Sequence, residues 1–151
     1  MKGEAEFDAE ETTLIDAEGA VLGRLASTLA SRSLDGEQFA VVNAEKIVVS
    51  GEKTDVVEKY REKVDEHGSD RGPYHPKRPD GIAKRAVRGM LPYKRQRGKD
   101  AFSRVRFYVG VPAEYADEEF EEPDKVVDDI GQGGYVTLGE VSEKIGANVT
   151  W

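Results

Sequence analysis

Cysteine is absent from the sequence, and histidine is scarce. Without cysteine the chain has no disulfide bond, no thiolate metal site and no cysteine nucleophile. The two histidines, His67 and His75, stand eight residues apart in a polar stretch, a spacing that is not typical of a metal-binding pair. We therefore predict that the protein uses neither a metal nor a cofactor.

Long hydrophobic runs are also missing. No apolar segment approaches the roughly 18 residues that a membrane-spanning helix needs, and Met1–Glu11 lacks the apolar core of a signal peptide. We expect a cytoplasmic protein with no membrane partner. The length of 151 residues predicts a single domain over residues 1–151.

Positive charge is scarce over most of the chain and concentrated in one segment. Residues 71–106 hold twelve Lys and Arg against two acids, Asp80 and Asp100, which gives a net charge of +10. The other residues carry −18, and the whole chain −8. Charges that serve only solubility mix their signs, whereas a concentrated block can hold a polyanion. The acidic remainder is typical either of a salt-rich cytoplasm or of ordinary drift in composition.

Apolar patterns predict an alternation of strands and helices. A strand is expected over 12–17, followed by a helix over 22–35 with apolar residues at helical spacing. Two apolar runs, 39–42 and 46–49, are typical of strands buried on both faces. Another helix is expected to carry the apolar positions between 56 and 64. This order predicts an α/β domain with some parallel strand pairing.

The basic segment is predicted to begin as an extended arm and to continue as a helix. Pro73, Pro76 and Pro79 recur at the three-residue turn of polyproline II, within the polar stretch 65–79. Asp80 is expected to cap a helix that runs to about Leu91.

Opposite faces of this predicted helix differ in chemistry. A helical projection places six apolar residues on one half, which we expect to pack on the core. They are Ile82, Ala83, Ala86, Val87, Met90 and Leu91. Lys84, Arg85 and Arg88 lie on the other half, and Tyr93–Asp100 is expected only to continue the basic run.

The C-terminal third is predicted to contain a strand, an acidic loop and a short helix. Val105–Gly110 has a strand pattern, and 113–132 is an acidic insertion with the character of a solvated loop. Thr137 and Glu140 form a capping-box pattern that opens a helix ending near Gly146.

No catalytic constellation stands out, and three classes of function remain open. Arginine offers a planar fork for phosphate, and aromatic side chains can stack on unpaired bases, which favours RNA as the polyanion. One alternative is a small α/β enzyme acting on a phosphorylated substrate, with the basic segment and Lys53, in the strand-to-helix turn Gly51–Thr54, as its anion site. The other is a free RNA-binding regulator.

Several ordered motifs resemble those of the large-subunit ribosomal protein L-thirteen family (universal name uL-thirteen), in its archaeal, halophilic form. They are Gly19–Ser27 (GAVLGRLAS), Val42–Gly51 (VNAEKIVVSG), Arg78-Pro79, Arg88–Pro92 (RGMLP), Gly98 and the strand Val105–Gly110. The resemblance covers residues 12–110. The acidic insertion 113–132 departs from the bacterial pattern, and 135–151 resembles the archaeal branch.

The resemblance implies a three-layer α/β/α single domain around a small, mainly parallel sheet, with an extended basic arm and an acidic insertion. It also implies a structural protein without enzymatic activity, which binds large-subunit ribosomal RNA, contacts neighbouring ribosomal proteins and supports early subunit assembly. No small-molecule substrate is expected.

Fourteen residues are candidates for RNA contact. For phosphate contact we expect Lys77, Arg78, Lys84, Arg85, Arg88, Lys94, Arg95, Arg97 and Lys99. Tyr74, His75 and Tyr93 are the candidates for base stacking, and Arg24 and Lys46 come from the family motifs.

Overall fold

The computed structural model describes residues 11–66, 75–123 and 134–151. Most of the predicted extended arm, including Tyr74, and the second half of the acidic insertion lie outside these residues. The described residues form a mixed α/β fold with a small, mainly parallel sheet, which confirms the predicted fold class.

Three parallel strands form the central sheet in the order β1-β2-β4. They are β1 (Thr12–Asp16), β2 (Gln38–Val42) and β4 (Val105–Phe107). Strand β2 lies in the middle, and its Phe39, Ala40, Val41 and Val42 are completely buried. The uninterrupted apolar run in β2 is therefore explained by burial on both faces.

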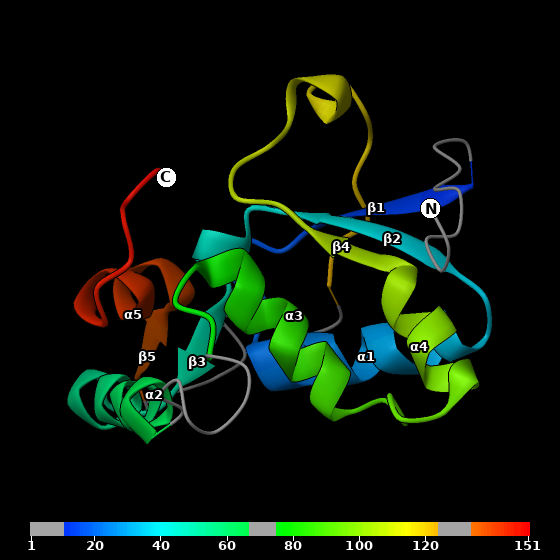
Figure 1. Cartoon of the computed structure of the whole chain (residues 1–151). Helices are drawn as coiled ribbons and strands as arrows, with labels where there is room; N and C mark the ends of the chain where they lie inside the picture. The colour runs from blue at the N-terminus through cyan, green and yellow to red at the C-terminus, as the bar shows by residue number, and fades with distance from the viewer. Residues whose placement is uncertain (1–10, 67–74, 124–133) are drawn as a thin grey trace.

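Helices α1 (Leu22–Leu34), α3 (Pro79–Gly89) and α4 (Gln96–Ser103) cover one face of this sheet (Figure 1). Helix α1 packs against both α3 and α4. Its apolar positions recur at three- and four-residue spacing, so that one face of the helix joins the main core.

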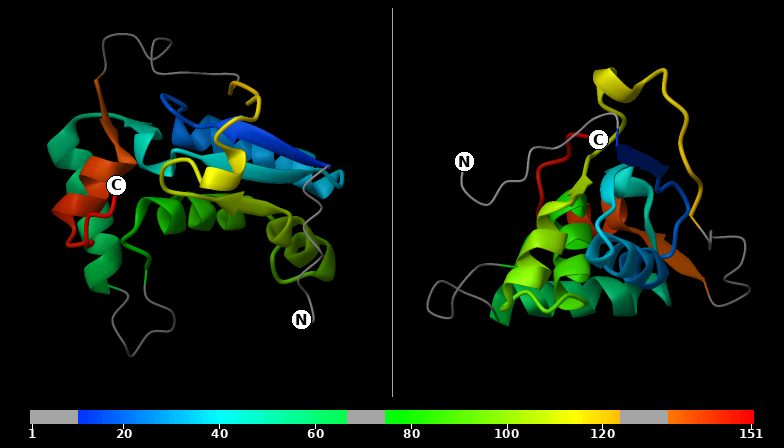
Figure 2. Two further views of the ribbon diagram at one scale, coloured as in Figure 1. Left: turned by 90° about the horizontal axis from the view of Figure 1, so that it is seen from above. Right: turned by 90° about the vertical axis from the view of Figure 1, so that its right-hand side faces the viewer.

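The opposite face of the sheet is covered by residues 108–122, which include the short 3-10 helix η3 (Ala113–Tyr115) (Figures 1 and 2). Tyr115 is buried in a second small core with Ala40 and Val42, and Phe120 packs at its margin. Glu121 pairs through its backbone with Leu14 and Asp16 at the outer edge of β1. Most of residues 113–122 are exposed, in keeping with a solvated loop, but the buried Tyr115 and the backbone pairing of Glu121 anchor this segment against the sheet. The second half, 124–132, lies outside the described residues.

A smaller antiparallel sheet lies beside the main one. It pairs β3 (Val48–Ser50) with β5 (Tyr135–Thr137), and α2 (Lys53–Glu66) and α5 (Leu138–Lys144) pack around it. The C-terminal segment is thus part of the fold.

The predicted capping box at the start of α5 is confirmed. The Thr137 hydroxyl accepts a hydrogen bond from the backbone N–H of Glu140, 3.2 Å away.

Three further details differ from the sequence prediction. The expected strand 46–49 begins as a 3-10 helix, η1 (Ala44–Lys46), because Asn43 turns the chain with a φ of 60°. Helix α3 begins at Pro79 with Arg78 as its N-cap, so Asp80 lies in the first turn and does not cap it. Helix α4 stands where only a basic run was expected.

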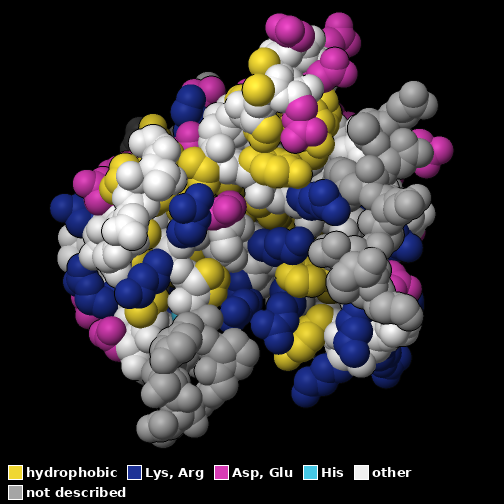
Figure 3. Space-filling view, turned by 45° about the horizontal axis from the view of Figure 1, so that its top comes forward, with side chains coloured by type: hydrophobic (Ala, Val, Ile, Leu, Met, Phe, Trp, Pro, Cys, Tyr) yellow, Lys and Arg dark blue, Asp and Glu magenta, His cyan; other side chains and the backbone are white. Residues whose placement is uncertain are grey.

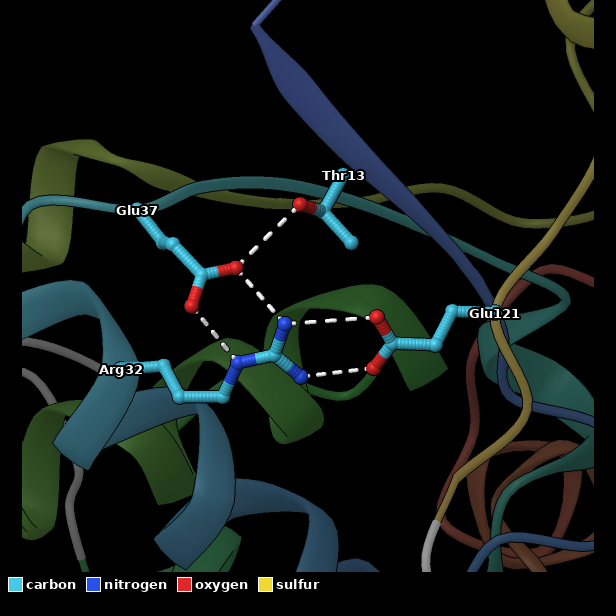
Figure 4. A network of polar contacts seen from close by, with 4 residues as sticks. All are labelled: Thr13, Arg32, Glu37 and Glu121. Carbon is cyan, nitrogen blue, oxygen red and sulfur yellow. Dashed lines mark hydrogen bonds and ion pairs between the residues drawn. The ribbon is translucent and has the colours of Figure 1, made fainter.

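One arginine joins the acidic segment to the rest of the fold. Arg32, on α1, places Nη1 2.6 Å from an oxygen of Glu121 and Nη2 2.7 Å from an oxygen of Glu37 (Figure 4). Its Nε donates a further bond of 2.8 Å to Glu37, whose other oxygen accepts from Thr13. This network connects α1, the start of β2 and the segment beside β1.

The network makes stability depend on pH. Hydrogen bonding from Arg32 lowers the pKa of Glu37 below its ordinary value. A lowered folded-state pKa stabilises the fold above the unfolded pKa of about 4.3, and this stabilisation disappears as pH falls through the lower folded value. We expect Arg32→Gln to lower the melting temperature by about 1–3 °C at pH 7, because the groups are partly exposed.

The difference in melting temperature between the wild type and Arg32→Gln should disappear below about pH 4. Thermal unfolding across a pH series measures it. Arg24→Gln is the matched control, because Arg24 is exposed on the same helix and has no ion pair within the described residues. A gap that persists unchanged in acid would contradict the assignment.

Candidate nucleic-acid interface

Helix α3 separates an apolar face from a cationic one, as predicted. Ile82, Ala83 and Val87 are buried in the main core, whereas Arg85 and Arg88 are only half-buried. Met90 is an exception, because the helix ends at Gly89 and leaves Met90 47% exposed. The prediction that Met90 packs on the core is therefore wrong.

Lys84 lies among the predicted phosphate contacts, but its side chain is used within the fold. Its Nζ donates a 2.7 Å hydrogen bond to the backbone carbonyl of Val105 and lies 4.7 Å from the centre of the Phe102 ring. The long aliphatic stem lets the charge reach this carbonyl from the polar side of α3. Lys84 therefore connects α3 to β4 and α4.

This geometry predicts a stability effect for Lys84. Lys84→Met keeps the stem but removes the hydrogen bond to Val105, so we expect it to lower the free energy of unfolding by about 1–3 kcal/mol. Chemical denaturation measures the loss, and Lys94→Met, on the exposed turn, is the control. RNA affinity of folded Lys84→Met should stay within about twofold of the wild type. A large loss of affinity with unchanged stability would show that Lys84 contacts RNA directly.

Arg85, Arg88 and Tyr93 form a compact group at the end of α3. The guanidinium carbon of Arg88 lies 4.1 Å from the centre of the Tyr93 ring, a distance typical of a cation–π contact. Burial, and then the neighbouring charge of Arg88, lower the pKa of Arg85. The two arginines therefore repel each other, and a bound anion would relieve this repulsion.

The turn after α3 and helix α4 provide the most exposed cations. Lys94, Arg95, Arg97 and Lys99 are all exposed, and within the described part of the chain none of them makes an ion pair. The single acid of α4, Asp100, accepts a hydrogen bond from Gln96. Figure 3 shows Lys and Arg side chains gathered over this part of the molecule, whereas acidic side chains stand out on the projecting segment above and occur elsewhere on the same face.

The beginning of α3 adds two exposed cations, Lys77 and Arg78. Arg78 is partly engaged, because its Nε lies 3.3 Å from a carboxylate oxygen of Asp80. His75 is buried, and its ring centre lies 6.1 Å from that of Tyr60. The structure thus places the His75 ring inside the fold.

Arg24 and Lys46 lie apart from the other candidates. Arg24 is exposed on the part of α1 that faces Glu121 and Pro123, where it lines a small recess. Lys46 lies on η1, with its Nζ 4.0 Å from Glu18 in a weak, exposed ion pair. The structure therefore brings together most of the candidates on α3, the following turn and α4. We call this group the basic face, and it consists of Arg85, Arg88, Tyr93, Lys94, Arg95, Arg97 and Lys99.

The alternative anion site around Lys53 has a different electrostatic character. A shallow hollow between α2 and α5 contains Lys53, Arg61 and Lys144. Each of the first two is paired with a carboxylate, Lys53 with Glu140 at 2.9 Å and Arg61 with Glu58 at 3.5 Å. This pairing leaves little positive charge for a phosphorylated substrate.

None of the described residues forms a group of three or more His, Asp or Glu side chains that could hold a metal ion. Within the same ranges, no helix is long and apolar enough to cross a membrane.

Sequence reasoning missed two features of this surface. It did not predict α4, the helix that holds Arg97 and Lys99 close together. It also did not show that the Arg104 side chain is bonded within the fold. Arg104 donates a 2.8 Å hydrogen bond to the carbonyl of Ser33 near the end of α1. The apolar positions of α4 are too few to signal a helix, as Gly98 and Ala101 are its only buried residues.

The fold and its surface define a small α/β protein with one cationic face, an arrangement suited to a polyanion. The profile of the family described as "Ribosomal protein L13" matches residues 10–114, and the chain belongs to this family. Relatives named "Large ribosomal subunit protein uL13" align over nearly the whole chain. The protein of Natronomonas pharaonis is 56% identical over 147 residues, covering 97% of this chain and 98% of that protein.

Two further relatives carry the same name. The Haloarcula marismortui protein is 51% identical over 148 residues, covering 97% of this chain and 98% of the relative. The Methanopyrus kandleri protein is 48% identical over 143 residues, covering 92% of this chain and 89% of that protein. The resemblance to the archaeal, halophilic form of the family is thereby confirmed.

Proposed function

We propose that this chain is a structural protein of the large ribosomal subunit and that it binds large-subunit ribosomal RNA through the basic face. The name of the matching family, the names of the relatives and their near-complete alignments support the ribosomal role. The observation that supports the binding surface is the set of four exposed cations on the turn after α3 and on α4, which have no ion pair within the described residues. A ribosomal role also agrees with the predicted cytoplasmic location.

The interface acts through direct contact with phosphates. Lys and Arg side chains displace condensed counterions from RNA, so that affinity falls as salt rises. At molar salt the Debye length is only about 3 Å, which removes long-range steering. A compact group such as Arg95, Arg97 and Lys99 keeps several cations within contact distance of one stretch of backbone.

The acidic part of the chain gives the domain its orientation. Exposed carboxylates of the segment 113–122, such as Glu118 and Glu119, lie on the far side of the sheet from α3 and α4 (Figure 1). Their repulsion from phosphate disfavours binding by this side. We infer that the basic face meets RNA and that the acidic segment faces away from it.

Sedimentation tests the proposal. Tagged full-length chain, expressed in a haloarchaeal host, should migrate with large subunits and remain bound through a high-salt wash. Retention only in the soluble fraction would contradict the ribosomal role and favour the alternative of a small α/β enzyme that acts on a phosphorylated substrate. Recovery on RNA other than ribosomal RNA, with no large-subunit fraction, would favour a free regulator.

A further inference from the structure

The end of α3 combines positive charge with exposed apolar and aromatic surface. Met90 is 47% exposed and Tyr93 is 36% exposed, within a turn that is otherwise rich in Lys and Arg. Phosphate binding does not require such groups, because cations alone make that contact. Leaving a methionine and a tyrosine in water is also unfavourable compared with covering them. The surface is therefore suited to a ligand that offers a flat, apolar face beside its phosphates.

Tyr93 is held in place before any ligand binds. Its backbone N–H donates a 2.8 Å hydrogen bond to the carbonyl of Leu91. Its backbone also lies against Gly98 of α4, and its ring carries the guanidinium of Arg88 at 4.1 Å. A side chain fixed in this way loses little conformational freedom on binding, which favours affinity.

We propose that Tyr93, with Arg88 and Met90 beside it, stacks on an unpaired base of the bound RNA. This inference rests on the proposed RNA-binding function and adds the conformation of the RNA that the basic face selects. In a regular A-form duplex the faces of the bases are covered by their neighbours, whereas a bulge or loop leaves a base free to stack on an aromatic ring. The ligand at this point is a single-stranded nucleotide flanked by phosphates.

Stacking has a different salt dependence from phosphate contact. It releases no condensed counterions, so its contribution persists when salt weakens the electrostatic part of binding. A protein whose relatives come from halophilic archaea benefits from such a contact. Removal of the Tyr93 ring should therefore shift the plot of log affinity against log salt downward without changing its slope.

Two RNA hairpins with the same stem test the proposal. One carries a single bulged 2-aminopurine, a fluorescent adenine analogue, and the other is fully paired. The full-length wild type should bind the bulged hairpin about 5–10-fold more tightly, as expected for one stacked base, and should change the 2-aminopurine emission. Tyr93→Ala should remove both the preference and the emission change, while Tyr93→Phe should keep them. Arg97→Gln should weaken binding to both hairpins equally and reduce the salt slope.

The outcomes separate this inference from the function on which it rests. Equal binding of both hairpins by the wild type, or an unchanged preference in Tyr93→Ala, would overturn the stacking inference. RNA binding by the basic face would still stand if Arg97→Gln weakened both complexes. Failure of the wild type to bind either hairpin would overturn both proposals. Circular dichroism of each variant verifies that the fold is retained.

Discussion

Reversing the charge of Arg97 and Lys99 together should nearly abolish binding to large-subunit ribosomal RNA while leaving the fold intact. Both side chains are exposed on α4 and lie within the first turn or just beyond it. Glutamate near the N-terminus of a helix interacts favourably with the helix dipole, so Arg97→Glu/Lys99→Glu should be as stable as the wild type. Each substitution removes a phosphate contact and adds a repulsive charge.

The expected loss of affinity is about 100-fold or more at moderate salt. The slope of log affinity against log salt should fall by about 1.5–2, because two fewer counterions are released. Filter binding or fluorescence anisotropy over a salt series, with large-subunit ribosomal RNA as the probe, measures both quantities. Thermal unfolding establishes that the variant is folded.

Lys59→Glu/Lys144→Glu is the matched control for this experiment. It makes the same change in net charge, but on α2 and α5, away from the basic face. Its effect on affinity should stay within about threefold if location matters and total charge does not. Similar losses in both double variants would show that RNA responds to net charge alone, and the basic face would lose its special role.

The regular parts of the fold could be predicted from sequence because their apolar patterns are complete. In α1, buried residues recur from Leu22 to Ala30 at helical spacing, and in β2 an unbroken apolar run crosses the middle of the sheet. Burial on one helix face, or on both faces of a strand, leaves such a pattern in the residues themselves. The family motifs then supplied the link to ribosomal RNA.

Features that depend on tertiary contacts were not predictable in this way. Helix α4 buries only Gly98 and Ala101, so packing against its neighbours, and not apolar periodicity, accounts for its position. The burial of Tyr115 was not predicted because its neighbours in the sequence are acidic, although an aromatic residue in such a stretch indicates an anchoring contact. Lys84 fell on the polar half of α3, and only the fold reveals the carbonyl within reach of its stem.

Gly98→Ala should disrupt the basic face from within. Alanine normally stabilises a helix relative to glycine, but a Cβ at position 98 would collide with the Pro92 carbonyl group and lie 2.9 Å from the Tyr93 nitrogen. These are backbone atoms that cannot rotate away, so the turn must move off α4. Overpacking of this kind costs about 1–3 kcal/mol or more, which corresponds to a fall in melting temperature of about 3–10 °C. Calorimetry measures the change.

The same substitution should weaken RNA binding by at least tenfold, since the turn carries Tyr93 and α4 carries Arg97 and Lys99. Gly23→Ala is the matched control, because Gly23 also lies in a helix and a Cβ there meets nothing within 4 Å. It should raise the free energy of unfolding by about 0.5–1 kcal/mol, raise the melting temperature slightly, and leave RNA affinity unchanged. If Gly98→Ala behaves like Gly23→Ala in both measurements, close packing of α4 on the turn does not hold the basic face together.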